Sequence, residues 1–379
     1  MLSAFSYSNQ VVTLNIDVSK IEIRNDLGSF LDGQKTVVGY AFVESDFEVE
    51  LDPRFSIKSK AAFEPIYARQ YYHKHYSNNV FFKDQGLYIK DLYANYGSKE
   101  GSVFLGKFAP EFGKAFNDDS GIWSNLGLPQ KYEVYEKIGI GGRKHTRWLR
   151  NTQPLTLSAS LFKPDTTPLQ HSWFVDRYTE DPPSMKTKEL ESMAIQASSR
   201  YNDLFDYYLG YRSIAHPKAS HETGYVVGIV GDAMVNGMAV SRLLEYTHLI
   251  NHNGHDAISS YWTYSVHGEK DFRLYSIAYT NYESADDQAS QFQVSTGYRF
   301  KNNVVWDIGI QYTTGKQKEW YIGSRLSIPI QSYTRSVALE TTYQNYEPLV
   351  QNGSTSDSSY RPDTNIADTA SPTPFPGFY

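Results

Sequence analysis

Long stretches in which apolar and polar residues alternate are the feature that most constrains what this chain can fold into. Between residues 303 and 315, one parity is apolar and the other holds polar residues and glycine. The apolar members are Val304, Trp306, Ile308, Ile310 and Tyr312. A period of two puts alternate side chains on opposite faces of a β-strand. The sequence therefore predicts an all-β protein whose strands have one apolar and one polar face.

Segments of this kind run along most of the chain. We expect strands near residues 10–24, 36–51, 54–67, 85–97, 101–109, 132–145, 154–163, 190–202, 205–215, 223–234, 237–249, 257–268, 272–282, 290–300, 303–314, 318–329 and 333–346. Most are longer than the about 5–6 residues usual in globular sheets. They reach the about 9–11 residues that a tilted strand needs to cross a bilayer, which is typical of a transmembrane barrel.

The expected connections alternate in length from residue 145 onward. Longer links fall at residues 164–189, 216–222, 250–256 and 283–289, and tight links at 203–204, 235–236, 269–271 and 301–302. The short link at residues 315–317 is the exception. Outer-membrane barrels alternate short periplasmic turns with longer outside loops. The expected segments number seventeen, whereas bacterial barrels are normally even-numbered. We therefore expect a closed antiparallel transmembrane β-barrel of sixteen strands, with one of the early segments outside the wall, and eighteen strands is the alternative if the C-terminal segment holds a further strand.

Several protein classes are excluded. The most apolar run, residues 225–231, is far shorter than the about 20 residues of a membrane-spanning helix. The absence of cysteine removes disulfide frameworks, Cys-ligated zinc and Fe–S clusters. A net charge of -6 argues against a nucleic-acid binder. The opening residues show no secretion signal, so we expect either an intracellular protein or a mature form numbered after signal removal.

Signatures of enzymes and metal sites are weak. The chain has no G-x-S-x-G elbow, and the glycines of residues 139–142 lie in a strand pattern with no helix after it. We interpret those glycines as relieving crowding inside a barrel wall. The close histidines His248, His252 and His255, like His73 and His75, are expected to be solvated loop residues. We predict no enzyme activity, no metal and no cofactor.

Residues 110–131 interrupt the alternation and are predicted to form a constriction loop. This segment carries Glu111, Asp118 and Asp119, with glycines that allow tight bending. The polar parity of the strands supplies a basic counterpart on the wall: Lys58, Lys60, Lys137, Arg143, Arg200, Arg212, Arg299 and Arg325. Opposed charges across a narrow pore would select solutes by charge and size. The alternative is that these charges are solvated in loops or at the rim of the wall.

One stretch resembles a known family. Residues 106–123, Gly-Lys-Phe-Ala-Pro-Glu-Phe-Gly-Lys-Ala-Phe-Asn-Asp-Asp-Ser-Gly-Ile-Trp, and residues 132–143, Tyr-Glu-Val-Tyr-Glu-Lys-Ile-Gly-Ile-Gly-Gly-Arg, are similar to the third-loop region of Gram-negative outer-membrane porins, especially alphaproteobacterial porin-like proteins. The resemblance covers about a tenth of the chain. It implies an inward-folded third loop that narrows the pore, and a homotrimer. The chain departs from the family at its end, where a proline-rich tail precedes Tyr379.

These observations predict a barrel at residues 1–346 and a C-terminal tail or terminal strand at 347–379. The expected function is that of a bacterial outer-membrane porin, in contact with outer-membrane lipid, that lets small hydrophilic solutes and ions diffuse through a water-filled pore. Two alternatives stay open. One is a substrate-specific uptake channel of the siderophore or oligosaccharide type, and the other is a non-conducting barrel for adhesion or envelope attachment.

Overall fold

The computed structural model describes residues 12–30, 35–65, 80–82, 85–118, 122, 127–148, 153–173, 189–202, 204–216, 220–285, 287–315, 318–329 and 333–337. The chain divides into two compact units, residues 1–340 and residues 341–379, and all the described residues belong to the first. No helix in the described part of the chain is both long enough and apolar enough to cross a membrane.

Antiparallel strands build the first unit. They are β1 (Val12–Phe30), β2 (Lys35–Asp52), β3 (Phe55–Pro65), β5 (Gln85–Ser98), β6 (Gly101–Phe108), β7 (Lys137–Trp148), β8 (Gln153–Pro164), β9 (Ser192–Tyr201), β10 (Phe205–Ile214), β11 (Glu222–Val235), β12 (Met238–Ile250), β13 (Ile258–Lys270), β14 (Arg273–Ser284), β15 (Gln288–Arg299), β16 (Val305–Thr314) and β17 (Glu319–Ile328). Two short strands, β4 (Val80–Phe81) and β18 (Tyr333–Val337), are added to them, and β4 pairs in parallel with β2.

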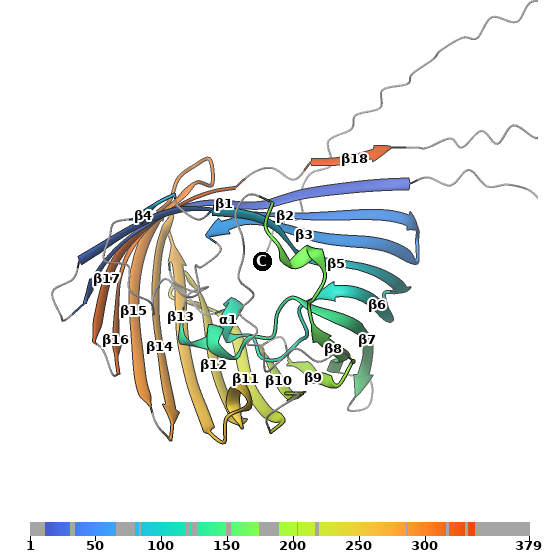
Figure 1. Ribbon diagram of the computed structural model, residues 1–379. Coiled ribbons are helices and arrows are strands. Elements are labelled where there is room, and N and C mark those ends of the chain that lie inside the picture. Colours follow the sequence, from blue (N-terminus) through green and yellow to red (C-terminus); the bar gives the residue numbers. More distant parts are fainter. Residues whose placement is uncertain are drawn as a thin grey trace, which may run out of the picture. The chain divides into compact units, whose positions relative to one another are not determined.

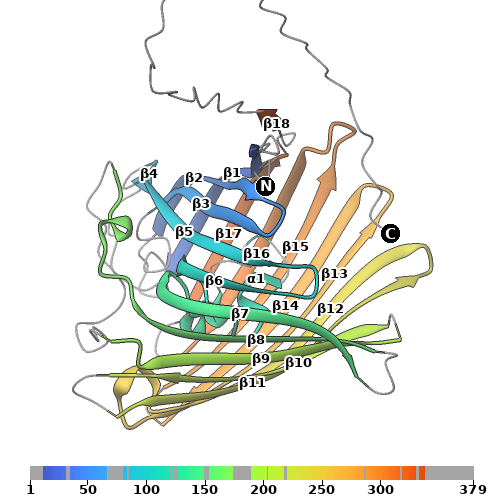
Figure 2. The same ribbon diagram turned by 90° about the vertical axis from the view of Figure 1, so that its right-hand side faces the viewer.

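Each strand of the wall pairs with its neighbours in the chain, and β1 pairs with both β2 and β17. Figures 1 and 2 show these strands side by side in sequence order around a central space. Short links such as residues 53–54, 99–100, 236–237 and 271–272 follow every second strand. The predicted alternation of tight and longer connections is therefore present between β8 and β14. It fails after β14, where the link at residues 285–287, predicted to be longer, is shorter than the link at residues 300–304, predicted to be tight.

Strands β17 and β18 both pair with β1. Residues Ile21–Phe30 of β1 pair with β17, and residues Val12–Ile16 of β1 pair with β18, in the same antiparallel sense. In the described residues, β18 thus continues the line of β17 along β1 and adds no new position to the wall. The alternative of an eighteenth strand falls in residues 338–379, which lie outside the described residues, so the strand count and the domain boundary at residue 346 stay predictions.

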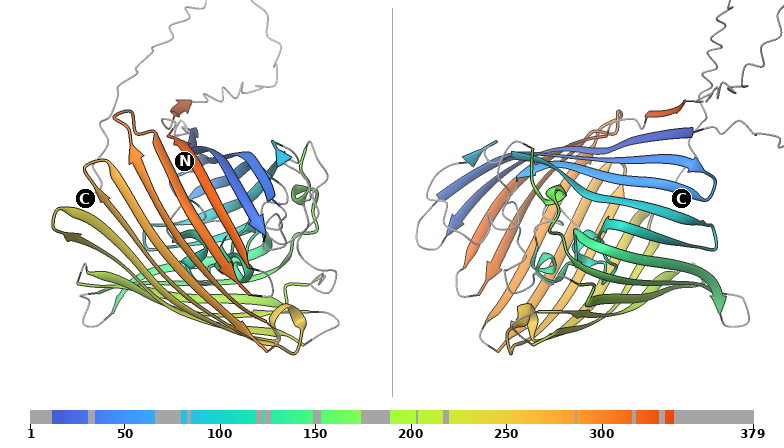
Figure 3. Two further views of the ribbon diagram at one scale, coloured as in Figure 1. Left: turned by 90° about the vertical axis from the view of Figure 1, so that its left-hand side faces the viewer. Right: turned by 45° about the vertical axis from the view of Figure 1, so that its right-hand side comes forward.

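Apolar and polar side chains are distributed in the reverse of the usual order. On β16, Trp306, Ile308 and Ile310 are 44–47% exposed on the outer face, whereas Asp307 and Gln311 are 5% and 2% exposed on the inner face. Figure 3 (left) shows the yellow to orange strands β11 to β17, which carry most of the exposed large apolar side chains among those that the structure describes. The predicted all-β antiparallel fold with one apolar and one polar face per strand is confirmed.

The predicted strand 132–145 begins too early. Strand β7 starts at Lys137, and residues Leu128–Tyr132 form the 3-10 helix η1. Tyr132 and Val134 alternate with polar residues as they would in a strand, but both are buried in a hydrophobic cluster with residues of β8 to β13. Loop packing against the inner wall therefore imitates the period of a strand.

Candidate functional site

The connection between β6 and β7, residues 109–136, folds into the space enclosed by the strands. Its helix α1 (Ala115–Asp118) lies beside β12 inside the ring (Figure 1). Phe112, Phe116 and Tyr132 of this connection are at most 7% exposed and pack against inward residues of the wall. Burial of apolar side chains thus fixes this inward loop against one side of the lumen.

A carboxylate on the wall holds the start of α1. Glu245 of β12 accepts hydrogen bonds from the backbone N–H groups of Lys114, at 2.6 Å, and Ala115, at 3.2 Å. It also accepts from the hydroxyl groups of Tyr208, at 2.5 Å, and Tyr132. Glu245 is 1% exposed, and its partners compensate for the loss of hydration that burial imposes on a carboxylate.

Gly113 is required for this contact. Its φ is +80°, in the region that favours glycine, and an added Cβ would lie 3.0 Å from Oε2 of Glu245. The N–H of Gly113 donates to Oε1 of Gln196 on β9 at 2.8 Å. Both the backbone conformation of Gly113 and its close approach to the wall therefore require glycine at this position.

Two further wall residues bind the second half of the loop. Gln291 of β15 accepts from the N–H of Leu128 at 3.1 Å. Arg212 of β10 donates to the carbonyl of Tyr132, pairs with Glu222 at 2.5 Å, and lies 4.6 Å from the ring centroid of Phe112. The inward loop is therefore tied to β9, β10, β12 and β15.

A buried lysine ties the base of the loop. Lys107, near the end of β6, is 0% exposed and pairs with Glu136 at 3.0 Å and with Asp165 at 2.9 Å. It also donates to the carbonyl of Leu169 at 3.1 Å. Sequence reasoning missed this residue, although it stands in the Gly-Lys-Phe stretch that carried the porin resemblance.

The opposite side of the lumen contains a cavity of about 1170 Å³. Residues of β2, β3 and β5 to β9 line it, together with residues 109–116 and Glu133 of the inward loop. It reaches the tight turns at residues 53–54 and 99. Because the loop is tied to β9–β15, the open space is left beside β2–β8.

Two of the predicted charged residues form an ion pair at the wall of this cavity. The guanidinium of Arg143 on β7 contacts Oε1 of Glu111 on the loop through Nη2 at 2.5 Å and Nε at 2.6 Å. Both side chains line the cavity and are partly exposed. Asp118 ends α1, but the position of its side chain and all of Asp119 lie outside the described residues.

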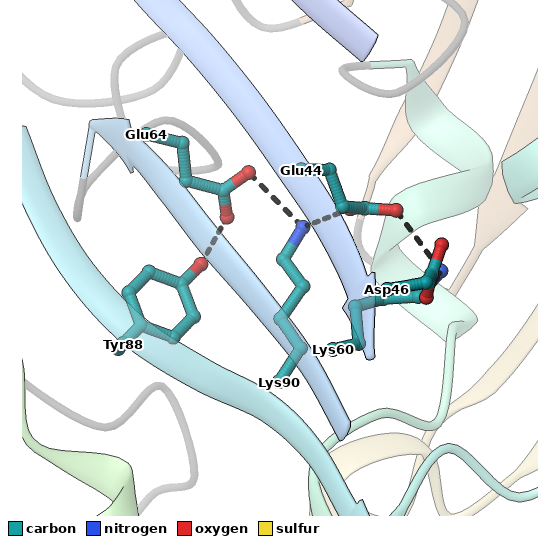
Figure 4. A network of polar contacts seen from close by, with 6 residues as sticks. All are labelled: Glu44, Asp46, Lys60, Glu64, Tyr88 and Lys90. Carbon is teal, nitrogen blue, oxygen red and sulfur yellow. Dashed lines mark hydrogen bonds and ion pairs between the residues drawn. The ribbon is translucent and has the colours of Figure 1, made fainter. Parts of the chain in front are cut away.

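Lys58 and Lys60 face the lumen beside carboxylates of β2. Lys58 pairs with Glu48 at 3.0 Å, and Lys60 pairs with Glu44 at 2.9 Å. Figure 4 shows how Lys60 and Lys90 share Glu44 in a network that extends to Asp46, Glu64 and Tyr88. The acidic partners follow a pattern that sequence reasoning overlooked, since Glu44, Asp46, Glu48, Glu50 and Asp52 occupy one parity of a single strand.

The remaining predicted basic residues are placed differently. Arg200, Arg299 and Arg325 pair with Asp206, Glu269 and Asp307 at 2.8, 2.8 and 3.0 Å. Arg212 is 2% exposed beneath the loop, and Lys137 is 7% exposed. Both line a smaller cavity of about 160 Å³ beside η1. The wall thus carries ion pairs between strands in place of a uniformly basic surface.

The loop between β12 and β13 contains a buried histidine, His252, so the expectation that it is solvated is wrong; His248 lies in strand β12 and not in a loop. Desolvation by burial lowers the pKa of His252 to about 4, although the nearby Glu222 carboxylate opposes this shift. Its Nδ1 lies 3.2 Å from the hydroxyl of Ser259. Within the described ranges, no three histidine or acidic side chains are arranged to hold a metal ion. His73 and His75 lie outside those ranges.

No protein-family model matches the sequence, and no curated protein matches it. The structure is similar to OmpF of Salmonella typhi, with a TM-score of 0.54 and 11% identity over 84% of this chain and 98% of that chain. It is also similar to the outer-membrane channel DcaP of Acinetobacter baumannii, with a TM-score of 0.53 and 13% identity over 87% and 100% of the two chains. For OmpT of Vibrio cholerae the TM-score is 0.51 and the identity 11%, over 85% and 99%. The chain therefore has the fold of outer-membrane β-barrel porins and channels.

Proposed function

We propose that this protein is a diffusion channel of a bacterial outer membrane, through which small hydrophilic solutes and ions pass. The observation that carries the proposal is the cavity between the inward loop and β2–β9, which is lined by charged side chains. Outward apolar side chains suit contact with lipid, and β1 pairs with β17 as well as with β2, which supports a barrel.

In this proposal the inward loop narrows the pore, and Glu111 and Arg143 stand at the narrow place. Asp118 and Asp119 of the same loop belong to the proposed acidic side. A homotrimer and membership of the alphaproteobacterial porin-like group are carried only by the resemblance of residues 106–123 and 132–143. An enzymatic role is not part of the proposal.

The test is conductance of the purified, folded protein in a planar lipid bilayer, with reversal potentials measured in a salt gradient. Large ohmic steps are expected. One charge at about 10 Å in water changes the energy of a monovalent ion by about 0.4 kcal/mol, with opposite signs for cations and anions, so each neutralised charge should change the cation-to-anion permeability ratio about fourfold. Arg143→Gln should shift selectivity toward cations, and Glu111→Gln should shift it toward anions.

Lys144→Gln is the matched control. Lys144 follows Arg143 on β7, and its exposed side chain belongs to the opposite parity and so to the outer face. It should leave selectivity unchanged. Absence of conductance in correctly folded protein would rule out the channel, and equal shifts in all three variants would remove Glu111 and Arg143 from the narrow place.

A further inference from the structure

Part of the cavity wall is aromatic. Tyr93 of β5 and Phe104 of β6 both line the cavity, with ring centroids 5.6 Å apart. Phe108 continues the row, with its ring centroid 4.8 Å from that of Phe104. The interior of an open transmembrane barrel is ordinarily polar. Phe108 is 3% exposed, whereas Tyr93 and Phe104 are half-buried. These two partly exposed rings are therefore unusual in a lumen and form the kind of surface that binds a ligand.

The backbone holds the middle ring in place. Phe104 pairs with Gly141 of β7, and a Cβ added to Gly141 would lie 2.4 Å from the Phe104 ring. The glycine therefore leaves the space that the ring occupies over β7. Phe104 is half-buried, so this seat supports the ring without covering it completely.

Two cations lie beside the rings. The guanidinium of Arg143 is 5.9 Å from the centroid of Phe104, and in its contact with Glu111 it uses only Nε and Nη2, both on one carboxylate oxygen. Lys114 of the inward loop lines the same cavity, with its ammonium group 5.4 Å from the ring of Tyr208. Among the described residues, no carboxylate forms an ion pair with Lys114.

We infer that this cavity retains small anionic solutes that combine a flat unsaturated ring with a carboxylate. The ring of the solute would stack on Phe104 and Tyr93, and its carboxylate would accept hydrogen bonds from Arg143 and Lys114. A ring-bearing cation would meet the like charge of Arg143. Carboxylates also line the cavity: Glu48 is paired with Lys58 and Glu111 with Arg143, Glu50 and Asp52 lie on β2, two strands from β5, and Asp91 and Glu133 lie on β5 and on the inward loop. The inference deepens the proposed function, because such a solute would reach the cavity through the lumen.

Benzoate is the probe, and acetate and benzylammonium are its controls. In planar bilayers, benzoate should reduce the single-channel current in a saturable way, whereas acetate lacks the ring and benzylammonium has the wrong charge. Phe104→Leu should weaken the benzoate effect about tenfold, measured against the benzoate-free current of the same variant, because ring stacking is lost. Phe292→Leu is the matched control, since Phe292 is 46% exposed on the outer face of β15.

Saturation-transfer NMR of benzoate with the folded protein gives a second readout that does not depend on conductance. Ring protons should receive magnetisation from the wild type and the Phe292 variant, and far less from the Phe104 variant. A protein that conducts but responds equally to benzoate and acetate would overturn the inference and leave the channel intact. A protein that binds benzoate through Phe104 but does not conduct would refute the channel and keep the site. Unchanged benzoate binding in Phe104→Leu would place any binding elsewhere and sink the inference.

Discussion

Replacement of Glu245 by glutamine should release the inward loop from the wall. In the folded protein, Oε2 of Glu245 accepts from the N–H groups of Lys114 and Ala115 and from the hydroxyl of Tyr208, while Oε1 accepts from Tyr132. Glutamine keeps one acceptor oxygen and puts an N–H donor in place of the other. The better orientation keeps the oxygen toward α1 and turns the amide nitrogen toward the Tyr132 hydroxyl, which must then rotate to accept.

The magnitude follows from the charge that is lost. Hydrogen bonds to charged groups contribute about 1.5–3 kcal/mol, compared with about 0.5–1.5 kcal/mol for neutral pairs. Weakening four such bonds would remove about 4 kcal/mol, and the easier burial of a neutral amide offsets roughly half of that. A net loss of about 2 kcal/mol raises the undocked population of the loop roughly 30-fold.

Hydrogen exchange of the loop amides measures this population directly. Exchange at Lys114 and Ala115 should accelerate roughly 30-fold, because these amides are protected by Glu245 itself and exchange follows the population of the open form. Leu128, which is held by Gln291, should change less. Glu269→Gln is a suitable control, since Glu269 pairs with Arg299 away from the loop. Wild-type exchange at both amides in folded Glu245→Gln would refute the assignment of Glu245 as the anchor.

Three further predictions concern stability. Lys107→Met should lower the free energy of unfolding by about 3–5 kcal/mol, because it leaves the carboxylates of Glu136 and Asp165 buried without their cation. Chemical denaturation in lipid vesicles measures this loss, and a change under about 1 kcal/mol would contradict the prediction. Ile308→Arg should cost about 2–4 kcal/mol in the same assay if this outward residue of β16 lies near the bilayer midplane, whereas no loss would show that this face does not contact lipid. His252 has a folded pKa of about 4, below the about 6.5 of an unfolded histidine. The free energy of unfolding should therefore be unaffected by this histidine above about pH 6.5 and should fall by about 3 kcal/mol at most as pH falls toward 4, because the unfolded chain then binds the proton more tightly. His252→Gln should make the free energy of unfolding depend less steeply on pH between about pH 4 and 6.5. An unchanged slope in this range would argue against the role given to His252.

The faces of the strands were predictable because side-chain alternation is a local property. Ile308 and Ile310 lie on the outer face, as their parity indicated. Local pattern failed at residues 132–136, where Tyr132 and Val134 have the parity of a strand but belong to the inward loop. A period of two does not distinguish pairing with a neighbouring strand from packing against a wall.

The site was predictable only in part. Glu111 and Arg143, which are 32 positions apart in sequence, do come together. The prediction of a basic wall left out the acidic residues that pair with it, although the alternating carboxylates of residues 44–52 were visible in the sequence. Which lysine faces which carboxylate depends on strand register, and a β-bulge at Lys90 of β5, opposite Lys60 and Ala61 of β3, shifts that register.

The sequence by itself determined the class of fold, because the length and period of its segments suit strands that have one apolar face and cross a bilayer. It also placed the interruption at residues 110–131 and the acidic residues within it. Only the tertiary structure decided where that loop lies. Glu245, Gln196, Gln291 and Arg212 lie 80 to 163 positions from their partners in the loop, and these contacts arise only when the curvature of the wall brings the four residues around it. The cavity lined by Tyr93, Phe104, Lys114 and Arg143 is the part of the lumen that the inward loop leaves open when it is held against the other side.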